Sequence, residues 1–455
     1  MSATHETNWK DLGEFTAKVM EEKGVPGVAV GILHQGETAA AGFGVTNADH
    51  PLPVTDKTLF QIGSITKTFT GTAIMRLIEK GKLDLNATVR TYLPDFKVAD
   101  ERAASQATIR HLLTHMGGWV GDFFDDTGAG DDALAKYMAN MADLDQLAPI
   151  NTVWSYNNAG FYLAGYIIEV VSGKSYQETL KELVLEPLGL ESSYFDAGDV
   201  MTHRFAVGHN VSETGTQIAR PWPLPRAAYP AGGITCNVPD LLSYAQFHLG
   251  DGRTDDKTRL LSAESMTQMQ SPQASVWGNE TWGLTWGINE INGTRQISHG
   301  GGTIGQISLL ILVPEHKFAI AILTNANRGG AVTRDVSRWA LKKYLGLESP
   351  DPVSIEASEE ELTPYVGRYS RPFMSIELGL LGGKLVGQMT YKRGFPAQDS
   401  PPPPAPPPAS LVLCEKDRLL VMDGPLKDAK IDVVRKPDGT IGWLRVGGRI
   451  HAREG

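Results

Sequence analysis

The first part of the chain carries a helical and then a strand-type pattern of apolar residues. In residues 9–22 the apolar side chains fall on one helical face, and Gly24 lies just past the predicted end of that helix. Residues 27–34 and 37–45 have strand-type patterns, and the intervening Gln35-Gly36 suits a two-residue hairpin turn. We therefore expect one helix followed by two antiparallel strands.

The middle of the chain is predicted to be mostly helical, and strands return after it. Helical patterns that stop at or near a glycine cover residues 64–80, 108–115, 158–172 and 239–249. Strand patterns cover residues 282–291, 296–299, 306–313 and 318–325, and a last helix is expected at 331–344. Strands at both ends with helices between them predict an α/β (α+β) fold, in which an antiparallel sheet is flanked by helices and has a helical subdomain beside it.

A second, smaller unit is predicted at the C-terminus. Residues 348–362 are rich in proline and acidic side chains, as linkers often are. Residues 363–455 contain short strand-type runs and turns but no helical pattern, which is typical of a small antiparallel β-barrel or sandwich. Within them Pro401–Pro408 cannot form a strand and is expected to be a stiff polyproline II segment. We expect a large domain at 1–347, a linker at 348–362 and a β-barrel domain at 363–455.

Charge and composition then exclude several classes of protein. The 455 residues include 42 Lys and Arg against 52 Asp and Glu, and the net charge of −10 argues against a nucleic-acid partner. No apolar run approaches the roughly 20 residues of a membrane span, so no membrane association is expected. Because the N-terminal segment has no apolar leader, we expect a cytoplasmic protein. The two cysteines, Cys236 and Cys414, cannot form a disulfide framework.

Three short motifs bring together residue types that serve acyl-transfer chemistry. Ser64 and Lys67 are three positions apart at the start of a predicted helix, so they share a face there, and an amine can activate a hydroxyl nucleophile. The other two motifs are Tyr156-Asn157-Asn158 and His299-Gly300-Gly301-Gly302. Each has an ordinary structural explanation: a capping serine with a solvated lysine, a turn before a helix, or a glycine-rich loop. Their joint occurrence in this order favours the chemical interpretation.

Together the motifs resemble those of the serine β-lactamase and penicillin-binding-protein family. The resemblance covers about residues 10–345 and is closest to the branch of class C β-lactamases, family VIII esterases, D-aminopeptidases and CubicO-type hydrolases. It implies that Ser64 is the nucleophile and that Lys67 and Tyr156 share the general-base role. It also implies an oxyanion hole formed by the N–H groups of Ser64 and Gly302, with neither a metal nor an organic cofactor.

The resemblance further implies substrate-binding roles for Asn158, His299 and Gly301, with Asn158 hydrogen-bonded to Lys67. One departure bears on the substrate. The third motif of familiar β-lactamases and transpeptidases is Lys-Thr-Gly, whereas this chain has His299-Gly300-Gly301. Because histidine is mostly neutral at pH 7, the substitution weakens the case for β-lactams and for substrates with a free carboxylate near the scissile bond.

The expected function is that of a serine hydrolase acting through an acyl-enzyme on small amides or esters. A D-amino-acid-type peptidase or amidase is preferred, because the C-terminal unit also resembles the lipocalin-like domain attached to some members of this branch. Alternatives are a family VIII carboxylesterase, a β-lactamase or DD-peptidase, and a penicillin-binding sensor without turnover. The expected partner is a small molecule or a short peptide, and homo-oligomer formation is left open.

Several weaker signals have two interpretations each. The acidic residues between 122 and 132 either attract a cationic substrate or, as we favour, form a solvated loop. Trp119, Phe123 and Phe124 either line an acyl pocket or pack in the core. His111 and His115 have the spacing of a zinc pair on a helix, but packing is favoured. Residues 392–408 either limit substrate size or, as favoured, form a surface loop.

Overall fold

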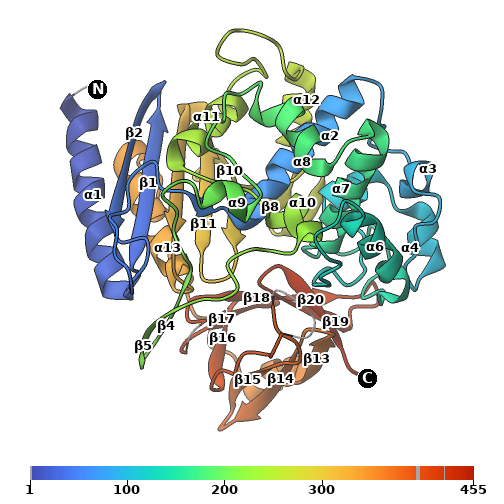
Figure 1. Ribbon diagram of the computed structural model, residues 1–455. Coiled ribbons are helices and arrows are strands. Elements are labelled where there is room, and N and C mark those ends of the chain that lie inside the picture. The colour runs from blue at the N-terminus through green and yellow to red at the C-terminus, as the bar shows by residue number, and fades with distance from the viewer. Residues whose placement is uncertain (1–2, 396–399, 425) are drawn as a thin grey trace.

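The larger part of the chain is built on an antiparallel sheet of eight strands, in the order β2-β1-β12-β11-β10-β9-β8-β7 (Figure 1). The computed structural model describes residues 3–395, 400–424 and 426–455. The strands of this sheet are β1 (Gly27–His34), β2 (Glu37–Gly44), β7 (Ala274–Trp277), β8 (Glu280–Trp282), β9 (Gly287–Ile291), β10 (Thr294–Gly302), β11 (Ile307–Val313) and β12 (Phe318–Thr324). The sheet therefore joins the N-terminal hairpin to strands from the end of this part, as the sequence predicts.

Alternation along β1 explains why the sheet is covered on both faces. Val28, Val30 and Ile32 pack in the apolar cluster beneath α1 (Ala3–Lys23) and α13 (Gly329–Leu345), whereas the intervening residues face the larger cluster on the opposite side. A β-carbon at Gly31 would lie 2.3 Å from a methyl group of Val238, so this glycine lets α11 (Val238–Leu249) lie close to the strand.

The remaining helices of this part form the helical subdomain and the second covering layer. They are α2 (Thr66–Glu79), α3 (Val89–Tyr92), α4 (Glu101–Gln106), α5 (Ile109–Leu113), α6 (Ala133–Asn140), α7 (Ala159–Ser172), α8 (Tyr176–Leu180), α9 (Ala197–Val200), α10 (Tyr229–Gly232) and α12 (Ala263–Met269). Two short sheets pair β3 (Phe60–Gln61) with β6 (Thr235–Cys236) and β4 (His209–Ser212) with β5 (Gly215–Ile218). In the described part of the chain, no helix is both long and apolar enough to cross a membrane.

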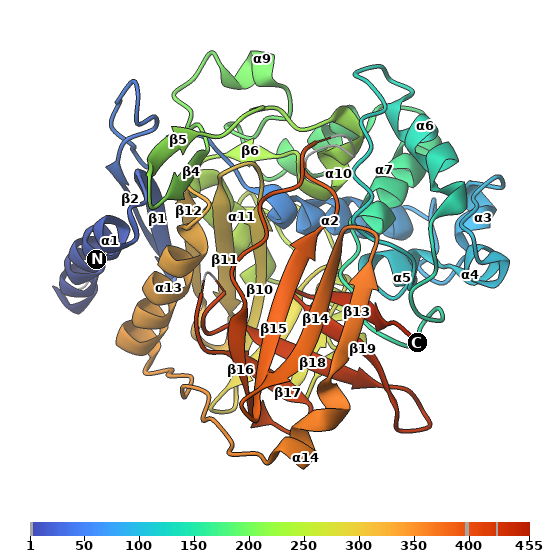
Figure 2. The same cartoon turned by 90° about the horizontal axis from the view of Figure 1, so that it is seen from below.

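The C-terminal strands close into an eight-stranded antiparallel barrel. It follows the short helix α14 (Glu359–Leu362) and comprises β13 (Gly367–Arg371), β14 (Met374–Leu381), β15 (Lys384–Tyr391), β16 (Ala409–Glu415), β17 (Arg418–Val421), β18 (Lys430–Arg435), β19 (Ile441–Val446) and β20 (Arg449–Arg453). The barrel lies beneath the junction between the sheet and the helical subdomain (Figures 1 and 2). The mixed α/β fold with a C-terminal barrel is thus confirmed.

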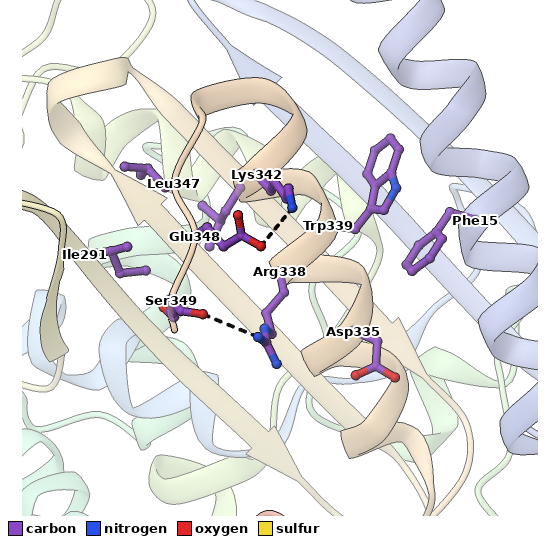
Figure 3. A pocket seen from close by; sticks show the side chains of 10 residues that line it. Phe15, Ile291, Asp335, Arg338, Trp339, Lys342, Leu347, Glu348 and Ser349 are labelled. Carbon is purple, nitrogen blue, oxygen red and sulfur yellow. Dashed lines mark hydrogen bonds and ion pairs between the residues drawn. The ribbon is translucent and has the colours of Figure 1, made fainter. Parts of the chain in front are cut away.

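The end of α13 and the start of the linker are fixed together (Figure 3). Gly346 ends the helix with a φ of +67°, and Lys342 forms an ion pair of 2.8 Å with Glu348 just beyond it. On the other side of α13, the ring of Trp339 stacks on Phe15 of α1 at 5.6 Å between centroids. A cavity of about 250 Å³ is lined by these groups, and none of the three motifs contributes to its lining.

The structure departs from the predicted elements in several places. The predicted strand 282–291 is broken, because the N–H of Gly283 bonds to the carbonyl of Trp286 and forms a turn between β8 and β9. Strand β20 was not predicted, because it is a run of five residues with arginine at both ends that follows a Gly-Gly turn. The predicted loop 392–408 is described in part only: residues 396–399 lie outside the described residues, and Pro406 accepts a hydrogen bond from Gln388 of the barrel.

Candidate active site

Ser64 lies in a tight turn between β3 and α2. The turn is a single 3-10 segment, Gly63–Ile65, which leads directly into the helix. Gly63 has a φ of +51°, and a β-carbon there would lie 2.7 Å from the amide nitrogen of Gly302 on β10. Glycine is therefore required at position 63 for two reasons, the positive backbone angle and the close approach of β10.

Lys67 lies one helical turn further on, beneath Ser64, and is completely buried. Its Nζ donates hydrogen bonds to Ser64 Oγ at 3.0 Å and to the carbonyl oxygen of Ala231 at 2.6 Å. The ring centroids of Tyr156 and Phe161 lie 5.0 and 5.5 Å from the same nitrogen. The amine is thus enclosed by two hydrogen-bond partners and two aromatic rings.

This enclosure changes the proton affinity of the amine. Burial lowers the pKa of Lys67 well below its usual value, the nearby Arg449 lowers it further, and Asp122 raises it. An uncharged amine carries a lone pair that can accept the proton of the Ser64 hydroxyl. The geometry therefore suits the activation of Ser64 by Lys67.

Tyr156 lies between the side chains of Lys67 and Arg449 and is held by the barrel. Lys67 Nζ lies 5.0 Å from its ring centroid, and the guanidinium of Arg449 lies 4.5 Å from it. The N–H of Tyr156 donates a hydrogen bond of 2.8 Å to the carbonyl of Gly448. Burial raises the pKa of Tyr156 well above its usual value, although Arg449 acts in the opposite direction. A hydrogen bond between its hydroxyl and Ser64 also lowers this pKa, so the phenol faces the candidate nucleophile.

The third motif packs β10 against the turn that carries Ser64. A β-carbon at Gly301 would lie only 1.9 Å from the carbonyl oxygen of Ile62, which in turn accepts a hydrogen bond from Ser308. His299 is buried, and its Nδ1–H donates to the carbonyl of Gly300 at 2.6 Å. Burial lowers the pKa of His299 to about 3, so the imidazole is neutral at pH 7. Close packing thus explains Gly301, whereas β-carbons at Gly300 and Gly302 would meet no atom nearer than 3.7 and 3.4 Å.

Asn158 makes a different contact from the expected one. Its Nδ2 donates to Asp122 Oδ1 at 2.8 Å, and no hydrogen bond joins it to Lys67 in the described part of the chain. Asp122 Oδ2 in turn pairs with Arg371 at 2.6 Å and with Arg449 at 3.3 Å, both from the barrel. The amide nitrogen of Asn158 is thus bonded to a carboxylate, while the Lys67 amine bonds to Ser64 and Ala231.

A cavity of about 880 Å³ opens above Ser64, with walls from both domains. Of the residues that the sequence indicates, Ser64, Tyr156, Asn158, His299, Gly301, Gly302 and Phe124 line it. Phe124 meets the rings of Phe373 and Phe395 at 5.9 and 4.8 Å, so the barrel completes an aromatic wall. The barrel also contributes Arg371, Met374, Tyr391, Gly448 and Arg449 to the lining.

The other two aromatic candidates are core residues, which corrects the pocket interpretation for them. Trp119 is 1% exposed and packs edge-on against Phe96, and Phe123 packs against Tyr137. The helical subdomain needs these large side chains to fill its interior, so only Phe124 of the three reaches the cavity.

The acidic segment after residue 121 divides in the same way. Asp131 and Asp132 form exposed ion pairs with Arg226 and Lys136, as expected for a solvated loop. Asp122 is buried and already paired with two arginines, so it is not free to attract a cationic substrate.

The two candidate histidines are used separately. His111 bonds to Thr108 at the start of α5, whereas His115 accepts a hydrogen bond from the N–H of Asn157. His115 also lies against the ring of Tyr156, at 4.3 Å between centroids. Both side chains therefore serve packing and hydrogen bonding.

Arg371 and Arg449 are the site residues that the sequence did not indicate. Arg449 follows the Gly447-Gly448 turn, and Arg371 ends β13, so both look like ordinary barrel residues in the sequence. An arginine directly after a Gly-Gly turn is compatible with a functional hairpin tip, but nothing local connects it to Ser64. Only the docking of the barrel brings them together.

Comparison with known proteins gives the relatives and structural neighbours of the chain. Penicillin-binding protein 4 of Amycolatopsis lactamdurans is 34% identical over 360 residues, which cover 77% of this chain and 94% of that protein. The structure of SurE has a TM-score of 0.77 at 22% identity and covers 99% of this chain and 100% of that chain; SurE with D-Leu gives 0.76. The octameric penicillin-binding protein homologue from Pyrococcus abyssi has a TM-score of 0.65 at 26% identity, over 98% of this chain and 99% of that one. The profile of the Beta-lactamase family matches residues 12–343, and the chain therefore belongs to that family of serine β-lactamase and penicillin-binding-protein-like proteins.

Proposed function

We propose that the chain is a serine hydrolase that forms an acyl-enzyme on Ser64 and cleaves small amides, preferably peptides that contain a D-amino acid. The observation that carries this proposal is the 3.0 Å contact between Ser64 Oγ and the buried Nζ of Lys67. Because burial keeps the pKa of Lys67 well below its usual value, the amine is suited to take the hydroxyl proton.

The proposed reaction has two halves. In acylation, the Ser64 oxygen bonds to the substrate carbonyl carbon while its proton moves to Lys67. The N–H groups of Ser64 and Gly302 stabilise the resulting oxyanion, which is supported by the position of Gly302 against the turn at Gly63. The C–N bond then breaks, and the amine leaves with a proton delivered through Tyr156. In the second half, water bonds to the acyl carbon while its proton moves to the Lys67–Tyr156 pair. The bond between the acyl carbon and Ser64 Oγ then breaks, the proton returns to Ser64 Oγ, and the acid leaves.

The size and lining of the cavity support a substrate of peptide size. A volume of about 880 Å³ lies in the range that holds drug-sized ligands. Arg449 lines the cavity with 30% of its side chain exposed and offers a cation to a substrate carboxylate. A substrate with a carboxylate therefore has a cationic partner in the cavity even though His299 is neutral. The structure of SurE with D-Leu, a neighbour that includes the barrel, supports a D-residue.

A carboxylesterase is the second candidate, and the apolar wall favours it. Phe124, Phe373 and Leu224 line the cavity, and an uncharged ester would bury its apolar groups there without needing a cation. The chemistry at Ser64 is the same for both substrates, so only the relative rates on amides and esters separate the two functions.

A labelling experiment tests the nucleophile. A fluorophosphonate probe should add its mass less that of HF to the native chain, because Ser64 Oγ bonds to phosphorus, fluoride leaves and the hydroxyl gives up its proton. Ser64→Ala should stay unlabelled, and the exposed control Ser105→Ala should label like the native chain. Equal labelling of Ser64→Ala and the native chain would contradict the assignment.

A substrate panel then separates the candidate functions. D- and L-aminoacyl anilides, p-nitrophenyl esters and a chromogenic cephalosporin should be assayed in parallel on the native chain. Faster turnover of D-aminoacyl anilides than of their L-isomers is expected. Turnover of esters alone would favour the carboxylesterase, and turnover of the cephalosporin would favour a β-lactamase. Acylation of Ser64 without turnover of any substrate would favour a sensor.

A further inference from the structure

Asp122 differs from every other acidic residue in its segment because it is buried at the meeting point of the two domains. Its side chain is 5% exposed, and each of its oxygens has its own set of partners. Oδ1 accepts from Asn158 Nδ2 at 2.8 Å, whereas Oδ2 pairs with Arg371 at 2.6 Å and Arg449 at 3.3 Å. A buried carboxylate with three donors holds all of them in place.

We propose that Asp122 is a positioning residue that couples the docking of the barrel to the assembly of the catalytic cavity. With one oxygen it fixes Asn158, and with the other it fixes Arg371 and Arg449. The proposal rests on the proposed function of Ser64, and Asp122 acts through its partners because it does not touch Ser64 or Lys67 by any hydrogen bond in the described part of the chain.

The contact with Asn158 sets the direction of that amide. An ionised carboxylate only accepts hydrogen bonds, so the NH₂ group of Asn158 must face Asp122. Asn158 is one of the residues that line the cavity. With its NH₂ group turned to Asp122, its side-chain oxygen Oδ1 is the acceptor that remains for a substrate N–H. Without the carboxylate, either end of the amide could face the cavity.

The contact with Arg449 sets the position of a cation over the ring of Tyr156. The guanidinium lies 4.5 Å from the ring centroid, and its Nη1 also donates to the carbonyl of Gly447 at 2.7 Å. Arg371 is held in the same way, since its Nε bonds to His451 Nε2 at 3.1 Å. Burial lowers the pKa of His451 to about 3, so this imidazole is neutral and accepts the hydrogen bond from Arg371 without adding a charge. In the described chain, Asp122 is the one anion that pairs with both arginines.

The two charges have opposite effects on Lys67. Arg449 lowers and Asp122 raises the pKa of this amine. The other titratable groups around Lys67 are His115, His299 and Tyr156, which carry no charge at pH 7 because burial lowers the pKa of the imidazoles and raises that of the phenol. The acylation rate falls at low pH when Lys67 becomes protonated, and this fall is the acid limb of the pH–rate profile. Removing either charge should shift the acid limb, and the two removals should shift it in opposite directions.

The kinetic test measures acylation by p-nitrophenyl acetate between pH 5 and pH 10 in Asp122→Asn and Arg449→Met. The acid limb should move to lower pH in the first variant and to higher pH in the second. Each shift should be about half a unit to one unit, smaller than the 1–3 units of a charge in direct contact. Asp132→Asn, which removes an exposed carboxylate of the same segment, should leave the limb in place. Unmoved limbs in folded Asp122→Asn and Arg449→Met would overturn the proposal.

A second measurement keeps the proposal testable if Asp122→Asn is inactive or poorly folded. Hydrogen exchange of the full-length Arg449→Met variant, which retains the Arg371–Asp122 pair, should rise at least several-fold in residues 447–451 and 154–158. Unchanged exchange in both segments would overturn the coupling. A native chain that p-nitrophenyl acetate does not acylate at Ser64 would instead reject the proposed function, and exchange alone would then decide the role of Asp122.

Discussion

The backbone N–H of Tyr156 donates a hydrogen bond of 2.8 Å to the carbonyl oxygen of Gly448, so a catalytic candidate is anchored to the tip of a barrel hairpin. Neighbouring contacts strengthen this anchor. Arg445 donates to the carbonyl of Trp154 at 3.1 Å, and the indole of Trp443 donates to the carbonyl of Leu147 at 2.8 Å. The loop that leads to Tyr156 is thus held by the barrel along its length.

The anchor predicts that a single methyl group at Gly448 impairs the site. Gly448 has a φ of +80°, and a β-carbon there would lie 3.3 Å from the Trp154 ring and 3.4 Å from Tyr156 Cβ. Gly448→Ala should lower kcat/KM at least about tenfold, because small displacements of catalytic groups are costly. Gly439→Ala is the matched control, since its φ is +86° but no atom lies within 4 Å. Equal activity of the two variants would show that the anchor does not position Tyr156.

Tyr156 and Lys67 should be separable by the leaving group of the substrate. Lys67→Met should slow the acylation of Ser64 by amides and esters alike, by about 10²–10⁴-fold, the usual contribution of a general base. Tyr156→Phe should slow acylation of Ser64 by an amide by a similar factor but acylation by a p-nitrophenyl ester much less, because p-nitrophenolate leaves without a proton. Single-turnover acylation rates on a matched anilide and ester check this, since steady-state turnover also contains the deacylation step that both substrates share. Equal losses on both substrates would instead place Tyr156 in the deprotonation of Ser64.

The local parts of the fold and site were predictable, because neighbouring residues determine them. The hairpin of β1 and β2 follows from alternation and a two-residue turn, and the structure has it at Gly27–His34 and Glu37–Gly44. Ser64 and Lys67 meet because three positions on a helical segment place side chains together. Family resemblance then indicated that the distant Tyr156 and His299 join them, which spacing alone does not imply.

The other features of the site depend on how the barrel docks and how the helical subdomain packs, and neither can be predicted from a local sequence pattern. Asp122 looks like one acid among several, yet burial and two arginines from the barrel set it apart. Phe123 and Phe124 are neighbours of the same kind, and only the packing of the helical subdomain decides which one enters the core. Contacts between residues hundreds of positions apart therefore had to come from the structure.

These adjacent phenylalanines give a matched pair of variants. Phe123→Ala should lower the free energy of unfolding by about 3–5 kcal/mol, as for a buried aromatic side chain that leaves a cavity in the core. Phe124→Ala should cost less stability but raise KM for substrates with a large apolar group, because it opens the aromatic wall. Urea denaturation and steady-state kinetics on both variants check this. A similar loss of stability with no change of KM in Phe124→Ala would remove it from the binding wall.

Buried histidines should make the protein less stable as the pH falls below about 6.5, the ordinary pKa of the side chain. Burial lowers the pKa of His248, His299 and His451 to about 3, and it lowers that of His115 well below its usual value. Between these values the unfolded chain binds protons that the folded chain does not, so stability is complete above pH 6.5 and declines toward pH 3.

Each such histidine contributes a slope of up to about 1.4 kcal/mol per pH unit. Urea denaturation at pH 7.5, 6.5 and 5.5 should therefore show a falling free energy of unfolding. His248 lies away from the cavity, and His248→Gln should reduce the slope of this free energy against pH by the share of one proton, about 1.4 kcal/mol per pH unit. The exposed control His50→Gln should leave the slope unchanged. A free energy of unfolding that is constant from pH 7.5 to 5.5 would mean that these imidazoles can take up protons in the folded chain. The neutral state of His299 beside Lys67 would then have to be abandoned as well.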